Sequence, residues 1–317
     1  NPSQHSAGGY LMGFILNPLY DIVSAVIVGI HKGLTPIFGA DSGVSWSLAI
    51  IGLVVLIRII LIPLFVKQIK SQRALTALQP HMKAIQTKYK DDRQKQSEEL
   101  MKLYKEHKTN PLASCFPILA QAPIFFALFT VLNGIGKNPP VAHGVLSEAD
   151  VVSAAGAKFF GAPISQTFLG STNTTVKIVT ILLIAFMSAT TFTTQRQLMT
   201  KGMPKMDTTN NMMLQQQKIM LYLFPVIFAV SGVNFPVGVL IYWSTTNLWT
   251  WGQQFYVIKR NPTPGSPAWE ELQKKKIAKG EVSDNSSDKS SENGGGSVAT
   301  EEQKGQRKQP KKKKRKK

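Results

Sequence analysis

Cysteine and recognisable catalytic motifs are almost missing from this 317-residue sequence. Cys115 is the only cysteine, so the chain can form neither an internal disulfide nor a cysteine-based metal site. The five histidines are scattered, and no HExxH motif, GxSxG motif or glycine-rich phosphate loop occurs. These absences indicate a protein that is not an enzyme and that requires no cofactor.

Acidic residues are missing from the long apolar runs, and they number only 18 in the chain against 37 Lys and Arg. Apolar and basic residues are segregated in blocks, and the formal net charge is +19. A soluble domain would mix these classes at helical or strand period. The segregation therefore predicts an all-α polytopic membrane protein with basic aqueous segments.

Five apolar stretches are each expected to cross the membrane as a helix, because about 20 apolar residues span its roughly 30 Å hydrocarbon core. The lysine-rich segment after the first span lies in the cytoplasm on the positive-inside rule, which fixes the direction of every span. The predicted order is a first span at 43–66, a cytoplasmic antiparallel helical hairpin at 67–110, a second span at 111–132, an external loop at 133–175, a third span at 176–195, a cytoplasmic loop at 196–217, a fourth span at 218–233 and a fifth span at 236–258.

The hairpin is predicted from apolar residues that recur in steps of three and four. Its polar turn lies around Asp91 and Asp92, and Pro80 is expected to kink the first arm because proline lacks the backbone donor. The predicted seam consists of Leu75, Leu78, Met82, Ile85 and Tyr89 on the first arm and of Leu100, Leu103 and Tyr104 on the second.

Residues 1–42 are predicted to be an exported segment with one short helix. Asn17 and Pro18 suit the N-cap and the first helical position, and the helix would carry Asp21, Ser24 and His31 on one face. It is short for a span, which favours an interfacial helix in the membrane plane. A spanning signal anchor is the alternative. The N-terminus is expected outside and the C-terminus in the cytoplasm.

Residues 259–317 are predicted to be a disordered basic tail, because the composition turns to Pro, Ser, Gly, Asn and Lys. The final cations suit a contact with ribosomal RNA or with an anionic membrane surface. A purely solubilising role is the alternative. These cations are Lys311, Lys312, Lys313, Lys314, Arg315, Lys316 and Lys317.

Arg58 is the only formal charge away from the ends of the predicted spans. A central arginine costs roughly 2.5–3.5 kcal/mol on insertion scales, it cannot lose its proton, and no acid or histidine of the spans can pair with it. It is therefore expected to face water or neutral acceptors in a hydrated groove open to the cytoplasm. A clamp on backbone carbonyls is the alternative.

Neutral polar residues of the second, third and fifth spans could line this groove with Arg58, although such residues also serve as hydrogen-bonding links between membrane helices. Tyr242 and Trp243 are expected deeper than Trp249 and Trp251, which suit the aromatic belt. The polar candidates are Gln121, Ser188, Thr190, Thr191, Thr194, Gln195, Ser244, Thr245, Thr246, Asn247, Gln253 and Gln254.

Several segments, taken in order, resemble the YidC/Oxa/Alb family of membrane protein insertases in its bacterial form. They are Arg58 in the first span, LQPHMKAIQTKYKDD, NPLASCFPILAQAPIFFALF, QQKIMLYLFPVIF and NFPVGVLIYWSTTNLWTWGQQ, and the resemblance covers about residues 41–260. It implies five core helices around a hydrophilic groove that is closed toward the outside. It places the family's groove residues on Arg58, Gln121, Gln195, Tyr242 and Trp243, next to which Thr246 and Asn247 are expected.

The resemblance implies a non-enzymatic insertase and chaperone of nascent membrane proteins in the bacterial plasma membrane. The expected partners are nascent chains, the bilayer and the ribosome, which the tail and the hairpin would contact. The Sec translocon and the signal recognition machinery are further candidates. A membrane-anchored ribosome receptor and a channel or transporter are the alternative functions.

Overall fold

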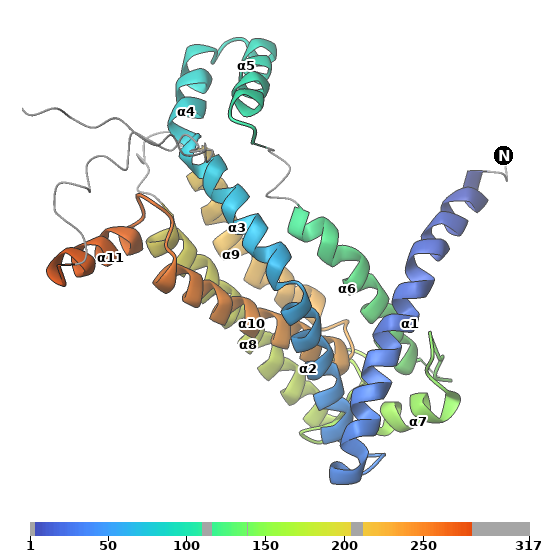
Figure 1. Cartoon of the computed structure of the whole chain (residues 1–317). Coiled ribbons are helices and arrows are strands. Elements are labelled where there is room, and N and C mark those ends of the chain that lie inside the picture. Colours follow the sequence, from blue (N-terminus) through green and yellow to red (C-terminus); the bar gives the residue numbers. More distant parts are fainter. Residues whose placement is uncertain (1–3, 110–115, 138, 204–211, 281–317) are drawn as a thin grey trace, which may run out of the picture.

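The computed structural model describes residues 4–109, 116–137, 139–203 and 212–280 (Figure 1). This part of the chain is almost entirely helical. Its elements are α1 (Gln4–Phe38), α2 (Gly43–Ile60), α3 (Ile62–Ala77), α4 (Gln79–Lys88), α5 (Arg93–Glu106), α6 (Phe116–Ile135), α7 (Glu148–Gly156), β1 (Lys158–Phe159), β2 (Ala162–Pro163), α8 (Thr174–Gln197), the π-helical turn η2 (Leu198–Gly202), α9 (Met212–Gly232), α10 (Val237–Arg260) and α11 (Pro267–Ala278).

Three helical stretches in the described ranges are long and apolar enough to cross a membrane: Leu16–Phe38, Gly43–Ile60 and Thr174–Gly202. Shorter apolar stretches occur in α6 and α9. Large apolar side chains stay exposed on the outside of the bundle, including Leu182 (63%) and Val230 (67%), as expected where lipid replaces water. These findings confirm the predicted all-α membrane protein.

Helix α10 lies at the centre of the bundle, where it packs against α8, α2 and α6. Residues 237–242 at its beginning are all buried. The two helices α8 and α10 run parallel, because Thr191 contacts Asn247 and Gly202 lies against Ile258 at the same sequence offset. Helix α9 packs on α8 and returns the chain to the start of α10. The first part of α10 is therefore enclosed by its neighbours.

The helix predicted over 43–66 is two helices that meet at Leu61. Helix α2 ends at Ile60, and α3 begins at Ile62 and continues to Ala77. Pro63 lies in the first turn of α3, where proline is tolerated, but it cannot donate a hydrogen bond to the carbonyl of Ile59 one turn earlier. The break consequently puts Arg58 in the last turn of α2.

Helices α4 and α5 lie side by side at the end of the molecule remote from α7 (Figure 1). The predicted interruption at Pro80 is confirmed, because α3 ends at Ala77 and Pro80 lies in the first turn of α4. The Tyr104 hydroxyl donates to the sulfur of Met82 at 3.5 Å. Asp92 caps α5 by accepting a hydrogen bond from the backbone of Lys95 at 3.0 Å.

Helix α1 is longer than predicted, because it begins at Gln4 and contains Pro18 in its interior. The predicted helix start at Asn17 and Pro18 is therefore wrong. Ser24 and His31 are buried against neighbouring elements, whereas Asp21 is exposed. The helix packs on α2 and α6, and its interfacial or spanning placement stays a prediction.

The region predicted as an external loop contains a small cap built from α7, β1 and β2. A capping box starts α7, since the Ser147 hydroxyl accepts from the Asp150 backbone and the Asp150 carboxylate accepts from the Ser147 backbone. The Trp46 indole of α2 donates to the hydroxyl of Ser153 at 3.1 Å. Ser24 of α1 accepts from the backbone of Val145 at 2.9 Å. The first bond joins α7 to α2, and the second joins the segment just before α7 to α1.

The predicted disorder of 259–317 is wrong for residues 267–278, which form α11 beside η2. Ser266 caps this helix by accepting from the Trp269 backbone at 3.2 Å, and Pro267 begins it. Gly280 follows it with φ +72°, a conformation that glycine adopts readily. Lys311–Lys317 and the expected start of the second span at 111–115 lie outside the described residues.

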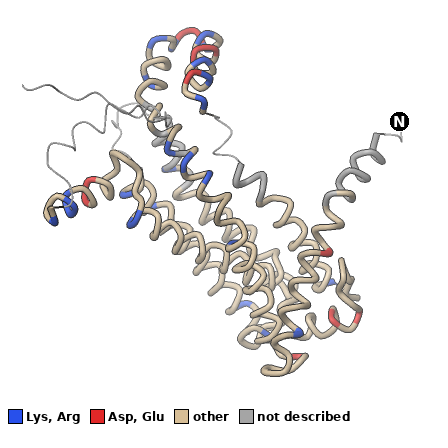
Figure 2. The backbone as a smooth tube through the Cα atoms, in the orientation of Figure 1, with Lys and Arg blue, Asp and Glu red and all other residues tan. Residues whose placement is uncertain are grey.

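Charge is unevenly distributed along the bundle (Figure 2). Lys and Arg gather on the α4–α5 hairpin, on the end of the bundle from which it projects, and on α11, whereas the middle of the bundle is nearly free of them. This distribution follows the cost of burying charge in hydrocarbon.

Candidate functional site

Arg58 projects from the last turn of α2 and is half-buried. It lies close enough to Tyr242 of α10 for an electrostatic interaction. Within the described residues its guanidinium forms no hydrogen bond and no ion pair. The free carbonyls at a helix C-terminus carry partial negative charge, which favours a cation by about 0.3–1 kcal/mol. The carbonyls at the end of α2, where Pro63 breaks the helix, therefore offset only part of the cost of burying Arg58.

Tyr242 joins three helices around Arg58. The Gln121 side-chain amide of α6 donates a hydrogen bond to the Tyr242 hydroxyl at 2.9 Å, and Arg58 of α2 approaches the same tyrosine. The Thr246 hydroxyl lies nearby, buried and without a well-formed hydrogen bond to any described residue. Arg58, Gln121, Tyr242 and Thr246 thus form one polar cluster, which we call the Arg58 site. A buried polar cluster with unused hydrogen-bonding capacity is suited to receiving a polar guest.

Trp243 lies on an adjacent face of α10, among phenylalanines. Its ring centroid is 4.9 Å from that of Phe228, 5.4 Å from that of Phe125 and 5.6 Å from that of Phe235. These rings come from α6, α9 and the turn before α10, so the indole links three segments by aromatic packing.

The remaining predicted site residues lie between helices. The Asn247 amide of α10 donates to the Thr191 hydroxyl of α8 at 3.3 Å, which joins the two parallel helices. Gln195 is half-buried near the end of α8, and its side chain forms no hydrogen bond within the described residues. The hydroxyls of Thr190 and Thr194 donate to carbonyls of their own helix. The structure therefore brings Gln121, Tyr242 and Thr246 to Arg58.

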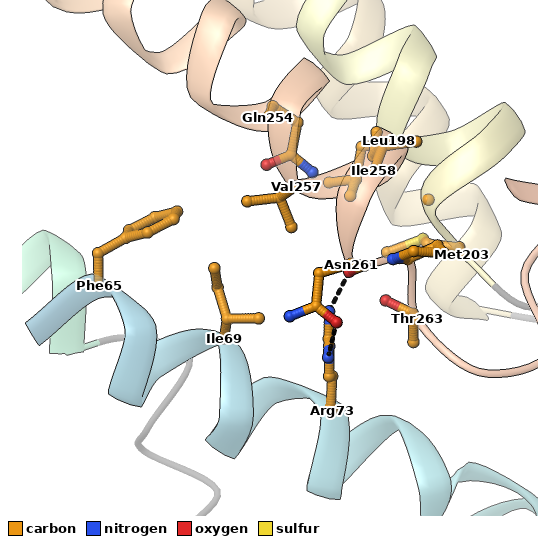
Figure 3. Close-up of a pocket in the computed structure, with 12 residues that line it drawn as sticks. Phe65, Ile69, Arg73, Leu198, Met203, Gln254, Val257, Ile258, Asn261 and Thr263 are labelled. Carbon is orange, nitrogen blue, oxygen red and sulfur yellow. Dashed lines mark hydrogen bonds between the residues drawn. The ribbon is translucent and has the colours of Figure 1, made fainter. Parts of the chain in front are cut away.

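A separate cleft of about 130 Å³ opens between α3, η2 and the end of α10 (Figure 3). Arg73 of α3 lies at one end, where its guanidinium donates to the Asn261 side chain at 3.1 Å and to the Asn261 carbonyl. Phe65 and Ile69 precede Arg73 along the same face of α3 and also line the cleft. Sequence reasoning missed Arg73, because one arginine does not stand out in a lysine-rich segment. The four-residue spacing from Phe65 through Ile69 was the available signal.

Comparisons with known proteins agree on one family. Residues 37–264 match the family described as 60Kd inner membrane protein. A Streptomyces avermitilis protein named membrane protein insertase YidC is 55% identical over 268 residues, which are 81% of this chain and 60% of that protein. A Tropheryma whipplei protein of the same name is 35% identical over 278 residues, with 83% and 89% of the two chains covered.

One solved structure, described as "Active YidC insertase crystal structure with the first transmembrane domain resolved", is also similar. It is 26% identical, with a TM-score of 0.45, and the match covers 72% of this chain and 46% of that one. The chain therefore spans less than two thirds of the Streptomyces relative and of the solved chain. The family match nevertheless covers most of the present sequence, and the chain belongs to the 60Kd inner membrane protein family, that of the YidC-type insertases.

Proposed function

We propose that this protein inserts nascent membrane proteins into the bacterial plasma membrane and helps them to fold. The names of its relatives support this function. The observation that carries it in this chain is the Arg58 site, where a half-buried guanidinium without an acidic partner in the described residues lies beside Tyr242 and Gln121. A hydrophilic segment of a client would supply the missing acceptors.

The electrostatics of the site favour acidic client segments. Interactions between a cation and a carboxylate strengthen as water is removed, because the effective dielectric constant falls. A buried charge that lacks its partner of opposite sign is uncompensated, which costs several kcal/mol. Arg58 thus gains most from a guest that carries an acid or several backbone carbonyls. Tyr242 and Gln121, fixed by their mutual hydrogen bond, present further polar groups to that guest.

Insertion would be driven by transfer of the client's apolar segment into lipid, since about 20 apolar residues suffice to span the bilayer. The membrane potential would add about 2.3 kcal/mol per charge and 100 mV for acidic segments that move outward. Asn247, through its hydrogen bond to Thr191, would hold α8 and α10 in place beside the client path, and Trp243 would hold α10 against α6 and α9. Gln195 would offer a further polar contact to the client near the end of α8. The client segment would enter from the hairpin end, with the N-terminus of the insertase outside and its C-terminus in the cytoplasm.

The test is reconstituted insertion of a short single-span client that carries acids in its translocated segment. Arg58→Ala is expected to lower insertion strongly, and Arg58→Lys to restore part of it, since lysine keeps the charge without the fork of donors. Arg196→Ala, at an exposed cation near the end of α8, is the matched control. Undiminished insertion by Arg58→Ala, for folded protein, would remove Arg58 from the mechanism.

A ribosome contact is a second proposal, favoured by the cations on the hairpin and α11 (Figure 2). Such a contact to RNA phosphates would weaken steeply with salt. Truncation after Gly280, which removes the final cations, should reduce cosedimentation with ribosomes at low salt. Equal cosedimentation of the truncated and full chains would assign the contact to the hairpin and α11. The Sec translocon and the signal recognition machinery remain candidate partners on the family resemblance.

A further inference from the structure

The cleft beside Arg73 combines an apolar wall with a single cationic end. In Figure 3, Phe65 and Ile69 of α3 face Val257 and Ile258 of α10 across it, and Arg73 lies at its far end with Asn261. Its volume is about 130 Å³, several times the roughly 10–15 Å³ that a single water molecule requires. The lining is mixed: apolar side chains such as Ile69 and Val257 offer a surface that a short piece of hydrocarbon chain can contact, and polar groups such as Gln254 and Thr263 lie beside them.

Exposed lysines occur in the segments that line this cleft. Lys70, Lys201 and Lys259 are exposed, and each is the sequence neighbour of a lining residue. Neither Asp nor Glu occurs among the described lining residues or directly beside them in sequence. These segments carry more cations than acids, which favours anionic over cationic ligands, while Glu270 and Glu271 of α11 are the acids of the helix that packs on η2.

The Arg73 guanidinium has hydrogen-bonding capacity left over. Two of its nitrogens bind Asn261, while its Nε atom is buried without a hydrogen-bond partner among the described residues. Asn261 accepts from only two of the five guanidinium N–H groups, so an oxygen that approaches the terminal nitrogens can accept from the others. Phosphate oxygens are well matched to the donors of arginine.

The cleft also lies where the bundle changes from apolar to charged. On α3, exposed Val66 is followed by exposed Lys67, and on α10 exposed Phe255 is followed one turn later by exposed Lys259. Such a boundary on two facing helices marks the level of lipid headgroups. An amphiphile in the bilayer can reach this level without leaving the membrane.

We propose that this cleft binds an anionic phospholipid, with the upper part of an acyl chain against Ile69 and Val257 and the phosphate at Arg73. The bound lipid would bridge α3 to the end of α10, because the two walls belong to these helices. The site is distinct from the Arg58 site, and it does not depend on the proposed insertase activity.

The test measures lipid retention by the full chain in neutral detergent, using native mass spectrometry with dioleoylphosphatidylglycerol or dioleoylphosphatidylcholine. The wild type is expected to retain the anionic lipid at least threefold better. Arg73→Gln should remove most of this preference, and Arg73→Lys should keep part of it. Lys102→Gln, at an exposed cation of the hairpin, removes the same charge elsewhere and should leave the preference unchanged. Equal retention of both lipids by the wild type would overturn the proposal.

Two further variants separate lipid binding from a latch between Arg73 and Asn261. Val257→Trp fills part of the cleft without changing its charge and should weaken lipid binding. Asn261→Ala removes the side-chain partner of Arg73 and should preserve lipid binding. Glycerol 3-phosphate, which carries the phosphate without a chain, should compete poorly. Effective competition by glycerol 3-phosphate, or loss of the preference in Asn261→Ala with Val257→Trp unaffected, would show that the cleft does not hold a lipid.

Discussion

Replacing Trp243 by alanine tests whether its main role is to hold α6, α9 and α10 together. In the cores of soluble proteins, removal of a large aromatic side chain costs about 3–5 kcal/mol, partly for transfer from water and partly for the cavity. Lipid tails are as apolar as a protein core, so the transfer part is small within a bilayer and packing dominates. Three aromatic contacts at 4.9–5.6 Å are lost together, and we expect about 2 kcal/mol of destabilisation.

The assay is equilibrium unfolding in mixed micelles with increasing dodecyl sulfate, followed by circular dichroism because the substitution removes a fluorophore. Trp243→Phe should lower the free energy of unfolding by less than half as much as Trp243→Ala does. Trp251→Ala is the control, since Trp251 is 37% exposed and stacks only on Phe255 among the described rings. The reasoning is refuted if Trp243→Ala unfolds like the wild type. Loss of insertion at unchanged stability would instead indicate direct contact with the client.

Two further predictions concern stability outside the site. A methyl group on Gly43 would lie 2.6 Å from the backbone N and carbonyl C of Lys158, so Gly43→Ala should lower the free energy of unfolding by at least about 1–3 kcal/mol. Gly33 has open space around it, so Gly33→Ala should raise the free energy of unfolding by up to about 1 kcal/mol through helix propensity. Equal melting temperatures of the two variants would contradict this. Burial, assisted by Lys137, lowers the pKa of His143 in the folded protein. As the pH falls, His143 is therefore protonated in the unfolded chain before it is protonated in the folded one, and stability should fall below the ordinary pKa of about 6.5. In His143→Gln, the melting temperature should vary less with pH between pH 7.5 and 5 than in the wild type. An unchanged slope would exclude His143 as a source of the pH dependence of stability.

The apolar blocks of the sequence were informative because backbone groups in lipid must be satisfied within a helix. The third span was predicted at 176–195, and α8 runs over Thr174–Gln197. Arg58 stood out for the same reason, as an isolated charge in an apolar run. Its neighbours could not be inferred without the family resemblance, because Gln121 and Tyr242 meet through packing of helices distant in sequence.

Local signals were overlooked where composition dominated the interpretation. Pro63 marks the break between α2 and α3, but it lies inside an otherwise uninterrupted apolar run. Ser266, Pro267 and Gly280 are ordinary start and stop signals for a helix, yet the lysine-rich tail around them suggested disorder. The error at the start of α1 is the opposite case, since the N-terminal signal at Asn17 and Pro18 is present but the helix begins earlier, at Gln4, and continues through it.

The central position of α10 has a consequence for the biosynthesis of this protein. Tyr242 is translated roughly 180 residues after Arg58, which at about 5–20 residues per second corresponds to a delay of about 10–40 s. During that interval α6 is made after α2, but the helix that covers both is not, and contacts so distant in sequence form late and slowly. The partly synthesised chain therefore exposes an unpaired arginine and uncovered apolar faces, and it meets the same difficulty as the clients that we propose it assists.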